Sequence, residues 1–150
     1  MKKQSAGILL YKKDPELKVF LVHPGGPFFA KKDLGVWSIP KGEYEDGEDP
    51  CVAAKREFKE ETGQEVSGEM KALSPIKMKS GKVVRAWAVE GDIDPGSLIS
   101  NTFSLEWPPH SDKQQKFPEI DRGDWFDLET AKTKINPAQV PLLEELTKVK

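Results

Sequence analysis

Hydrophobic positions along the chain predict strands that alternate with helices, with one long helix near the centre. Residues 5–11 and 19–23 are short apolar runs, and we predict two strands there, joined by a turn at 13–16. A loop rich in Pro, Gly and Phe follows, and a third short strand is predicted at 36–39. Residues 43–48 are polar and predict a loop before the helix.

Both ends of this helix carry terminal signals. Asp49 is a favourable N-cap residue, and Pro50 suits the first helical position, where a backbone N–H has no intrahelical partner. Gly63 is a favourable terminator because glycine adopts the left-handed conformation without strain. Phe58 is expected to face the core of the protein.

The second half of the chain predicts a hairpin, an irregular segment and a helical end. Residues 71–79 and 82–90 are predicted to pair around a Ser-Gly turn. Residues 91–118 predict a long irregular connection. The remaining predicted elements are a strand at 125–126, a short helical piece at 128–134 and a C-terminal helix at 137–149 with Val140, Leu142, Leu143 and Leu146 on its apolar side.

Strands on both sides of a central helix, with a closing helix, predict an α/β fold in which a mixed sheet lies between helices. The chain has 150 residues, of which 37% are hydrophobic, so we expect a single domain over residues 1–150. No apolar run approaches membrane-spanning length, and the first apolar run is too short for a signal peptide. The lone Cys51 suits a reducing cytosol, and we expect a cytoplasmic protein. The net charge of −2 does not favour nucleic-acid binding through bulk charge.

Carboxylates crowd one segment, residues 42–63. It holds eight acids and three bases, a net of −5, although the whole chain carries only −2. At about 100° per residue, Glu57, Glu60 and Glu61 share one face of the predicted helix. Like charges repel, so this clustering indicates a divalent cation, and hard oxygen ligands favour Mg²⁺ or Mn²⁺. Ala53, one turn earlier, is expected to leave room for the metal and for phosphates.

The same segment, GEYEDGEDPCVAAKREFKEETG, resembles the signature of the Nudix hydrolase family. In that signature a Gly is followed after five residues by Glu, and after seven more by Arg-Glu-hydrophobic-x-Glu-Glu-x-Gly-hydrophobic. The matching positions are Gly42, Glu48, Arg56, Glu57, Phe58, Glu60, Glu61 and Gly63. The departure is Gln64, where the family usually has an aliphatic residue. Val66 is expected to supply the missing packing.

This resemblance implies the Nudix fold and a metal-dependent pyrophosphohydrolase, in which water attacks one phosphorus of a P–O–P bridge. The metal ligands that it implies are the Gly42 carbonyl and the carboxylates of Glu57, Glu60 and Glu61. Arg56 would hold a glutamate in place by a salt bridge, and Glu48 would support the loop or a further metal.

Other candidate site residues lie outside the signature. The family often places a metal ligand or general base in the loop before a strand such as the one at 125–126, and Glu119 is the best candidate there. Its rivals are Asp121 and Asp124. Three lysines could bind phosphate on the substrate: Lys31, Lys32 and Lys41. His23 and His110 are expected to be non-catalytic, and Phe28, Phe29 and Trp107 are expected to pack, with base stacking as their alternative.

The substrate is expected to be a nucleoside or dinucleoside polyphosphate. Residues 37–42 (WSIPKG) resemble the lead-in of diadenosine polyphosphate hydrolases and of MutT-like enzymes. ADP-ribose hydrolases commonly carry a Pro where this chain has Lys79. Residues 91–118 could cover a second base. The alternatives are an ADP-ribose or nucleotide-sugar pyrophosphatase, and a Nudix fold kept as a non-catalytic binding module.

Overall fold

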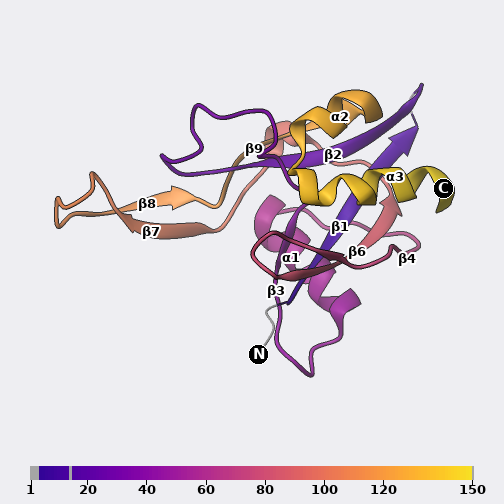
Figure 1. The fold of residues 1–150 in the computed structure, drawn as a ribbon, viewed down its shortest axis with the longest axis horizontal. Helices are drawn as coiled ribbons and strands as arrows, with labels where there is room; N and C mark the ends of the chain where they lie inside the picture. The colour runs from indigo at the N-terminus through magenta and orange to yellow at the C-terminus, as the bar shows by residue number, and fades with distance from the viewer. Residues whose placement is uncertain (1–3, 14, 150) are drawn as a thin grey trace.

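The computed structural model describes residues 4–13 and 15–149, and its main feature is a mixed sheet with helices on both faces (Figure 1). The strand order is β4-β6-β1-β2-β9, with β3 beside β1 and β5 beside β6. β1 and β6 are parallel, and the other pairs are antiparallel. The strands are β1 (Gln4–Lys13), β2 (Leu17–Pro24), β3 (Lys41–Glu43), β4 (Lys71–Ala72), β5 (Ile76–Lys77), β6 (Val83–Glu90) and β9 (Ile120–Asp127).

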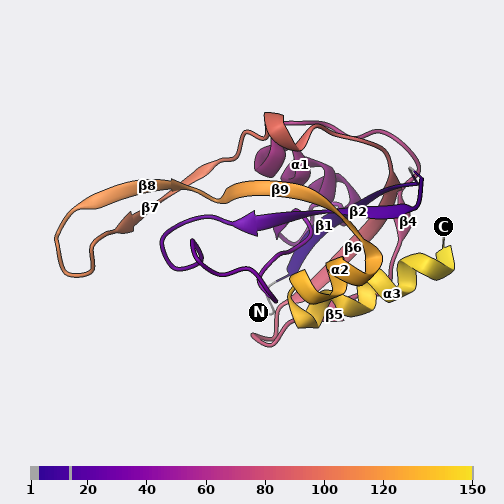
Figure 2. The same ribbon diagram turned by 90° about the horizontal axis from the view of Figure 1, so that it is seen from above.

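Helices cover both faces of this sheet, and Figure 2 shows α1 on one side with α2 and α3 on the other. The helices are α1 (Pro50–Thr62), α2 (Leu128–Lys134) and α3 (Val140–Val149), with short 3₁₀ turns η1 (Pro95–Ser97) and η2 (Pro137–Gln139). This arrangement confirms the predicted α/β fold with a mixed sheet between helices. No helix among the described residues is long and apolar enough to cross a membrane.

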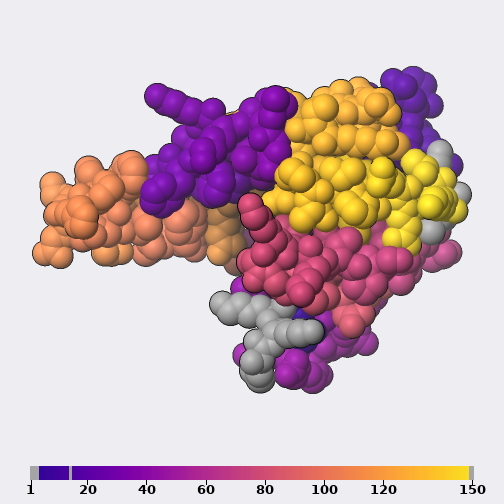
Figure 3. All heavy atoms as spheres, in the orientation of Figure 1, coloured from indigo at the N-terminus to yellow at the C-terminus, as the bar shows by residue number. Residues whose placement is uncertain are grey.

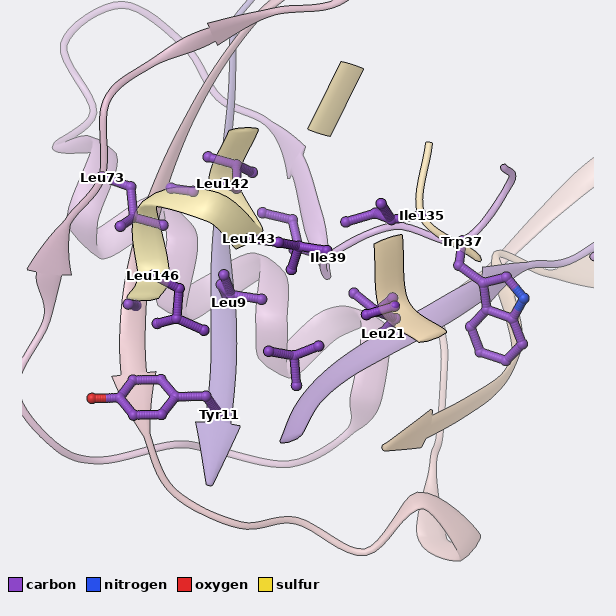
Figure 4. Packing of buried hydrophobic residues seen from close by; sticks show 14 residues of the cluster. Leu9, Tyr11, Leu21, Trp37, Ile39, Leu73, Ile135, Leu142, Leu143 and Leu146 are labelled. Carbon is purple, nitrogen blue, oxygen red and sulfur yellow. The ribbon is translucent and has the colours of Figure 1, made fainter. Parts of the chain in front are cut away.

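The central strand β1 is buried almost throughout because each of its faces is covered. Side chains alternate across a strand, so Leu9 and Tyr11 face α2 and α3, where Leu142 and Leu146 pack against them (Figure 4). Ile8 points to the other face and packs with the residues of α1. Two separate cores therefore stabilise the sheet, one on each side.

Helix α1 begins and ends where its sequence predicts. The Asp49 carboxylate accepts the N–H of Cys51 at 2.8 Å, and Pro50 opens the helix. Gly63 adopts a φ of 75° and donates its N–H to the Lys59 carbonyl at 2.7 Å. Phe58 is fully buried, as expected. These contacts fix where the helix begins and ends, and therefore the direction in which its carboxylates point.

The prediction of an irregular segment at 91–118 is wrong. Within it, β7 (Thr102–Glu106) and β8 (Gln114–Pro118) pair as a two-stranded antiparallel hairpin that projects from the body of the protein. We call residues 102–118 the arm; Figure 3 shows it with the loop of residues 25–36 against it. Phe28 and Trp107 join the two, with their rings edge to face at 5.6 Å.

Smaller differences concern three other segments. Residues 71–79 contain two short strands, β4 and β5. Both pair with β6, and the pairing is interrupted between them. Residues 36–39 make only isolated bridges, and the strand expected there lies later, as β3. The predicted turn at 13–16 includes residue 14, which lies outside the described residues.

Candidate active site

Strand β3 and helix α1 bring Gly42 and Glu57 into direct contact. Gly42 pairs with Ala6 of β1, and its missing side chain leaves the space that Glu57 occupies. A Cβ atom at residue 42 would lie 1.9 Å from Glu57 Oε2, so no larger residue fits there without a shift. The signature glycine therefore lets a carboxylate approach the backbone closely.

Arg56 joins three glutamates of the signature. Its guanidinium donates to both oxygens of Glu48, at 3.0 and 3.1 Å, and to Glu57 at 2.8 Å. Its distance to Glu60 is 3.3 Å. The bonds to Glu48 are the main cause that raises the pKa of Arg56. A fixed cation thus orients the loop and two helix carboxylates together.

Glu61 is the buried carboxylate of the site. It is only 7% exposed and accepts the backbone N–H of Lys41 at 2.9 Å. Burial raises the pKa of Glu61 to about 8, with Glu57 and Glu119 adding repulsion. Burial also lowers the pKa of Lys41, whose ammonium attracts Glu61. The pKa of Glu57 is raised, by burial first and by Glu60 next.

These groups fit a hard divalent cation. Carboxylate and backbone carbonyl oxygens are the ligands that Mg²⁺ and Mn²⁺ prefer, and the Glu57 carboxylate lies against the backbone of Gly42. Burial is the first cause of the raised pKa values of Glu57 and Glu61, and a bound cation would offset it by favouring the ionised carboxylates. Over residues 4–13 and 15–149, no three His, Cys, Asp or Glu side chains already stand in a metal-holding arrangement. Glu57 and Glu60 bond Arg56 instead.

Glu119 lies across a cleft from Glu61. The cleft has a volume of about 210 Å³, and the side chains that line it include Lys41, Glu61 and Glu119 beside the apolar Val36 and Ile120. Glu119 is exposed, and its charge contributes to the raised pKa of Glu61. Two carboxylates and one ammonium group from three segments therefore face the same space.

A series of backbone hydrogen bonds holds Glu119 in this place. Asn101 donates its N–H to the Glu60 carbonyl at 3.1 Å, and Glu119 donates to the Asn101 carbonyl at 2.8 Å. Gly25 then donates to the Glu119 carbonyl at 2.8 Å. A Cβ atom at Gly25 would lie 2.0 Å from the Pro118 carbonyl, so this approach requires glycine. The end of α1, the base of the arm and the 25–36 loop are thereby connected at one residue.

The candidate lysines separate into two environments. Lys41 lines the cleft next to Glu61. Lys31 and Lys32 are exposed on the 25–36 loop, and the Lys32 ammonium lies 5.6 Å from the centre of the Phe29 ring. The structure thus brings Lys41 to the carboxylates and leaves the other two exposed on the loop.

Two features differ from the sequence interpretation. Ala53 is fully buried in the core with Phe58, so it leaves no open space for a metal or phosphates. Sequence reasoning also missed the contact between His23 and Asp121, at 2.9 Å. A histidine at the end of an apolar strand was its only signal.

Val66 packs against the core as expected, while the Gln64 amide bonds the backbone of Asp94.

These elements define an α/β protein with a mixed sheet between helices. Its acidic site contains Glu57, which Arg56 bonds and which lies against Gly42. The family model described as NUDIX domain matches residues 1–146. The chain belongs to the NUDIX domain family.

Similar proteins agree with this assignment. Nudix hydrolase 25 of Arabidopsis thaliana is 42% identical over 86 residues, which cover 51% of this chain. The match spans 49% of that relative, so the chain corresponds to about half its length.

Solved structures show the same fold. A C. elegans Ap4A hydrolase in a binary complex superposes with a TM-score of 0.64 at 23% identity and covers 96% of both chains. The NUDIX domain of Shewanella oneidensis NrtR, solved with ADP ribose, gives a TM-score of 0.66 at 16% identity. That match covers 99% of this chain and 88% of the NrtR chain.

Proposed function

We propose that the protein, acting as one Nudix domain, is a metal-dependent pyrophosphohydrolase that cleaves a P–O–P bond of a nucleoside or dinucleoside polyphosphate. The observation that carries this proposal is the cleft in which Glu61, Glu119 and Lys41 meet beside the contact of Glu57 with Gly42. Family membership supports hydrolysis of a phosphorus-containing anhydride.

Each residue has a proposed part in the reaction. Glu57, Glu60, Glu61 and the Gly42 carbonyl would hold Mg²⁺ or Mn²⁺, which would neutralise phosphate charge and lower the pKa of an attacking water. Arg56 orients the carboxylates through its bonds to Glu48 and Glu57.

The cleft supplies the proton acceptor and a phosphate contact. Glu119 would accept a proton from the attacking water, because it is exposed to solvent and faces the cleft. Lys41 would contact the phosphate, since its ammonium lies among carboxylates that a metal-bound substrate would approach. Lys31 and Lys32 would contact phosphates farther from the reacting bond.

The arm is a reason to propose a substrate with more than two phosphates or with a second nucleoside. The Ap4A hydrolase neighbour acts on a dinucleoside polyphosphate by its name, and the WSIPKG segment resembles that branch. The exposed ring of Phe28 and the arm beside it offer a place for a base to stack.

A second candidate is an ADP-ribose pyrophosphatase. The NrtR neighbour was solved with ADP ribose, which is the observation that favours it. Against it stands Lys79 at the position where such enzymes commonly carry Pro. The lone Cys51 supports the cytoplasm as the place of action.

The test is kcat/KM for diadenosine tetraphosphate, a set of nucleoside triphosphates and ADP-ribose, each at matched Mg²⁺ and Mn²⁺. We expect the first two groups to be cleaved faster, and products to appear only with the metal. A higher value for ADP-ribose overturns the substrate assignment and leaves the hydrolase. Tight binding of nucleotides without any product would instead indicate a binding module.

A further inference from the structure

His23 is a buried side chain whose two ring nitrogens are both engaged. The residue is fully buried at the end of β2. Its Nδ1 lies 2.9 Å from a carboxylate oxygen of Asp121, and its Nε2 lies 2.6 Å from the backbone carbonyl of Lys32. A carbonyl oxygen can only accept, so Nε2 donates to Lys32, and Nδ1 lies within hydrogen-bond distance of the Asp121 carboxylate. The ring packs edge to face on Trp37 at 5.2 Å.

The two partners of His23 lie in the two segments that the proposed site has outside the signature: the 25–36 loop and the segment that contains Glu119. Lys32 lies on the 25–36 loop, next to Lys31. Asp121 lies two residues after Glu119, at the start of β9. Buried polar groups are costly when unpaired, so the ring holds both segments at once.

We propose that His23 is a positioning residue that sets the lysine-bearing loop against the segment of Glu119. The proposal rests on the proposed function, because it assigns the loop to substrate binding and Glu119 to proton transfer. His23 itself touches neither substrate nor metal. Its bond to Lys32 governs how well the substrate binds, and its bond to Asp121 governs how well Glu119 is placed for the reaction.

Two substitutions separate these bonds. In His23→Asn, the side-chain amide stands near the position of Nδ1, so the contact with Asp121 is kept and the donor to Lys32 is lost. In His23→Gln, the amide reaches the position of Nε2, so the donor to Lys32 is kept and the contact with Asp121 is lost. Asp121→Asn is a third variant, which weakens the same bond as His23→Gln without changing the buried ring. His110→Asn is the control, since His110 is exposed with a φ of 62° that asparagine tolerates.

The first readout is independent of activity. Hydrogen–deuterium exchange of the full chain should show faster exchange in residues 25–36 for His23→Asn and in residues 119–123 for His23→Gln and Asp121→Asn. His110→Asn should match the wild type in both segments. Equal loosening of both segments in every variant, or no change in either, would overturn the proposal.

The second readout is the division between KM and kcat with the best substrate of the panel. We expect His23→Asn to raise KM about fivefold or more with kcat within about twofold. We expect His23→Gln and Asp121→Asn to lower kcat by about the same factor with KM within about twofold, and to change the pH profile of kcat. Equal effects of all three on KM and kcat would reduce His23 to a structural residue. If the wild type hydrolyses nothing, the proposed function fails, while the exchange measurement still decides whether His23 couples the two segments.

Discussion

Residues 42–63 line the cleft through Glu61, and the segments opposite line it through Val36 of the 25–36 loop and through Glu119, which follows the arm. We call the 25–36 loop, the arm and the residues Asn101 and Glu119 that flank the arm the wall. The signature region and the wall are built in different ways. The signature segment is contiguous: Arg56 bonds Glu48 in the loop before α1 and Glu57 and Glu60 on α1 itself. The opposite wall is assembled from Gly25, Asn101 and Glu119, which lie far apart in the chain and are joined by backbone bonds. Because its bonds lie within one segment, we expect the signature region to act in the same way on every substrate. We expect selectivity between substrates to arise in the second region, which is assembled from distant loops.

The largest effect is expected from substitutions in the signature region alone. Glu60→Gln or Glu61→Gln should lower turnover of every substrate by about a hundredfold or more, because each removes one proposed metal ligand and with it several kcal/mol of transition-state stabilisation. The fold should persist, since like-charge repulsion is relieved. Turnover at saturating Mg²⁺ is the measurement.

Glu65→Gln is the matched control, because Glu65 is exposed and pairs with Lys59 on the surface. Either signature variant keeping more than about a tenth of wild-type turnover would contradict the ligand role.

The difference between the regions also explains what the sequence could predict. Helix α1 was predictable because Asp49, Pro50 and Gly63 act on their own neighbours. The arm was missed although Phe103, Leu105 and Trp107 alternate with polar residues, a period of two that indicates a strand. The prediction that Glu119 faces the metal site depends on its pairing with Asn101 and Gly25, which no local pattern encodes.

Two glycines test whether the regions contribute separately. Gly42→Ala should displace the Glu57 carboxylate and raise the Mg²⁺ concentration needed for half-maximal rate, with a loss of about tenfold or more in turnover. Gly25→Ala should displace the segment of Glu119, lowering kcat while the Mg²⁺ dependence stays unchanged.

Gly91→Ala is the control, since its new Cβ would meet only a Leu10 methyl group at 3.3 Å. If both site variants shift the Mg²⁺ dependence equally, the two walls do not act as separate parts.

The dependence of stability on pH gives a third test. The pKa of Glu61 is raised in the folded protein to about 8 from 4.5. Between these values the folded state keeps a proton that the unfolded chain has lost, so the contribution of Glu61 to the free energy of unfolding is largest below pH 4.5 and falls as the pH rises towards 8. Glu61→Gln removes this titration and should be more stable than the wild type at pH 8.5, by on the order of 2–4 kcal/mol.

Urea unfolding in a chelating buffer at pH 5 and pH 8.5 measures this difference. Adding Mg²⁺ at pH 8.5 should stabilise the wild type and not the variant, since a ligand that binds only the folded state raises its stability. Parallel pH curves for the two proteins would show that Glu61 ionises freely in the fold.

The smallest expected effect concerns the wall alone. Phe28 is 60% exposed, and its ring meets Trp107 at the junction of the 25–36 loop and the arm. If a second base stacks there, Phe28→Ala should lower kcat/KM for diadenosine tetraphosphate about fivefold, the low end of what one stacked base contributes. A nucleoside triphosphate has no second base, so its kcat/KM should stay within about twofold. Leu34→Ala is the control, because Leu34 is 68% exposed on the same loop and carries no ring. A loss shared by both substrates would place Phe28 in the folding of the loop, and a loss shared by Leu34→Ala would show general loosening of it. Only the selective loss would support our proposal that the wall contacts the far end of the substrate while the signature region acts on the phosphate bridge.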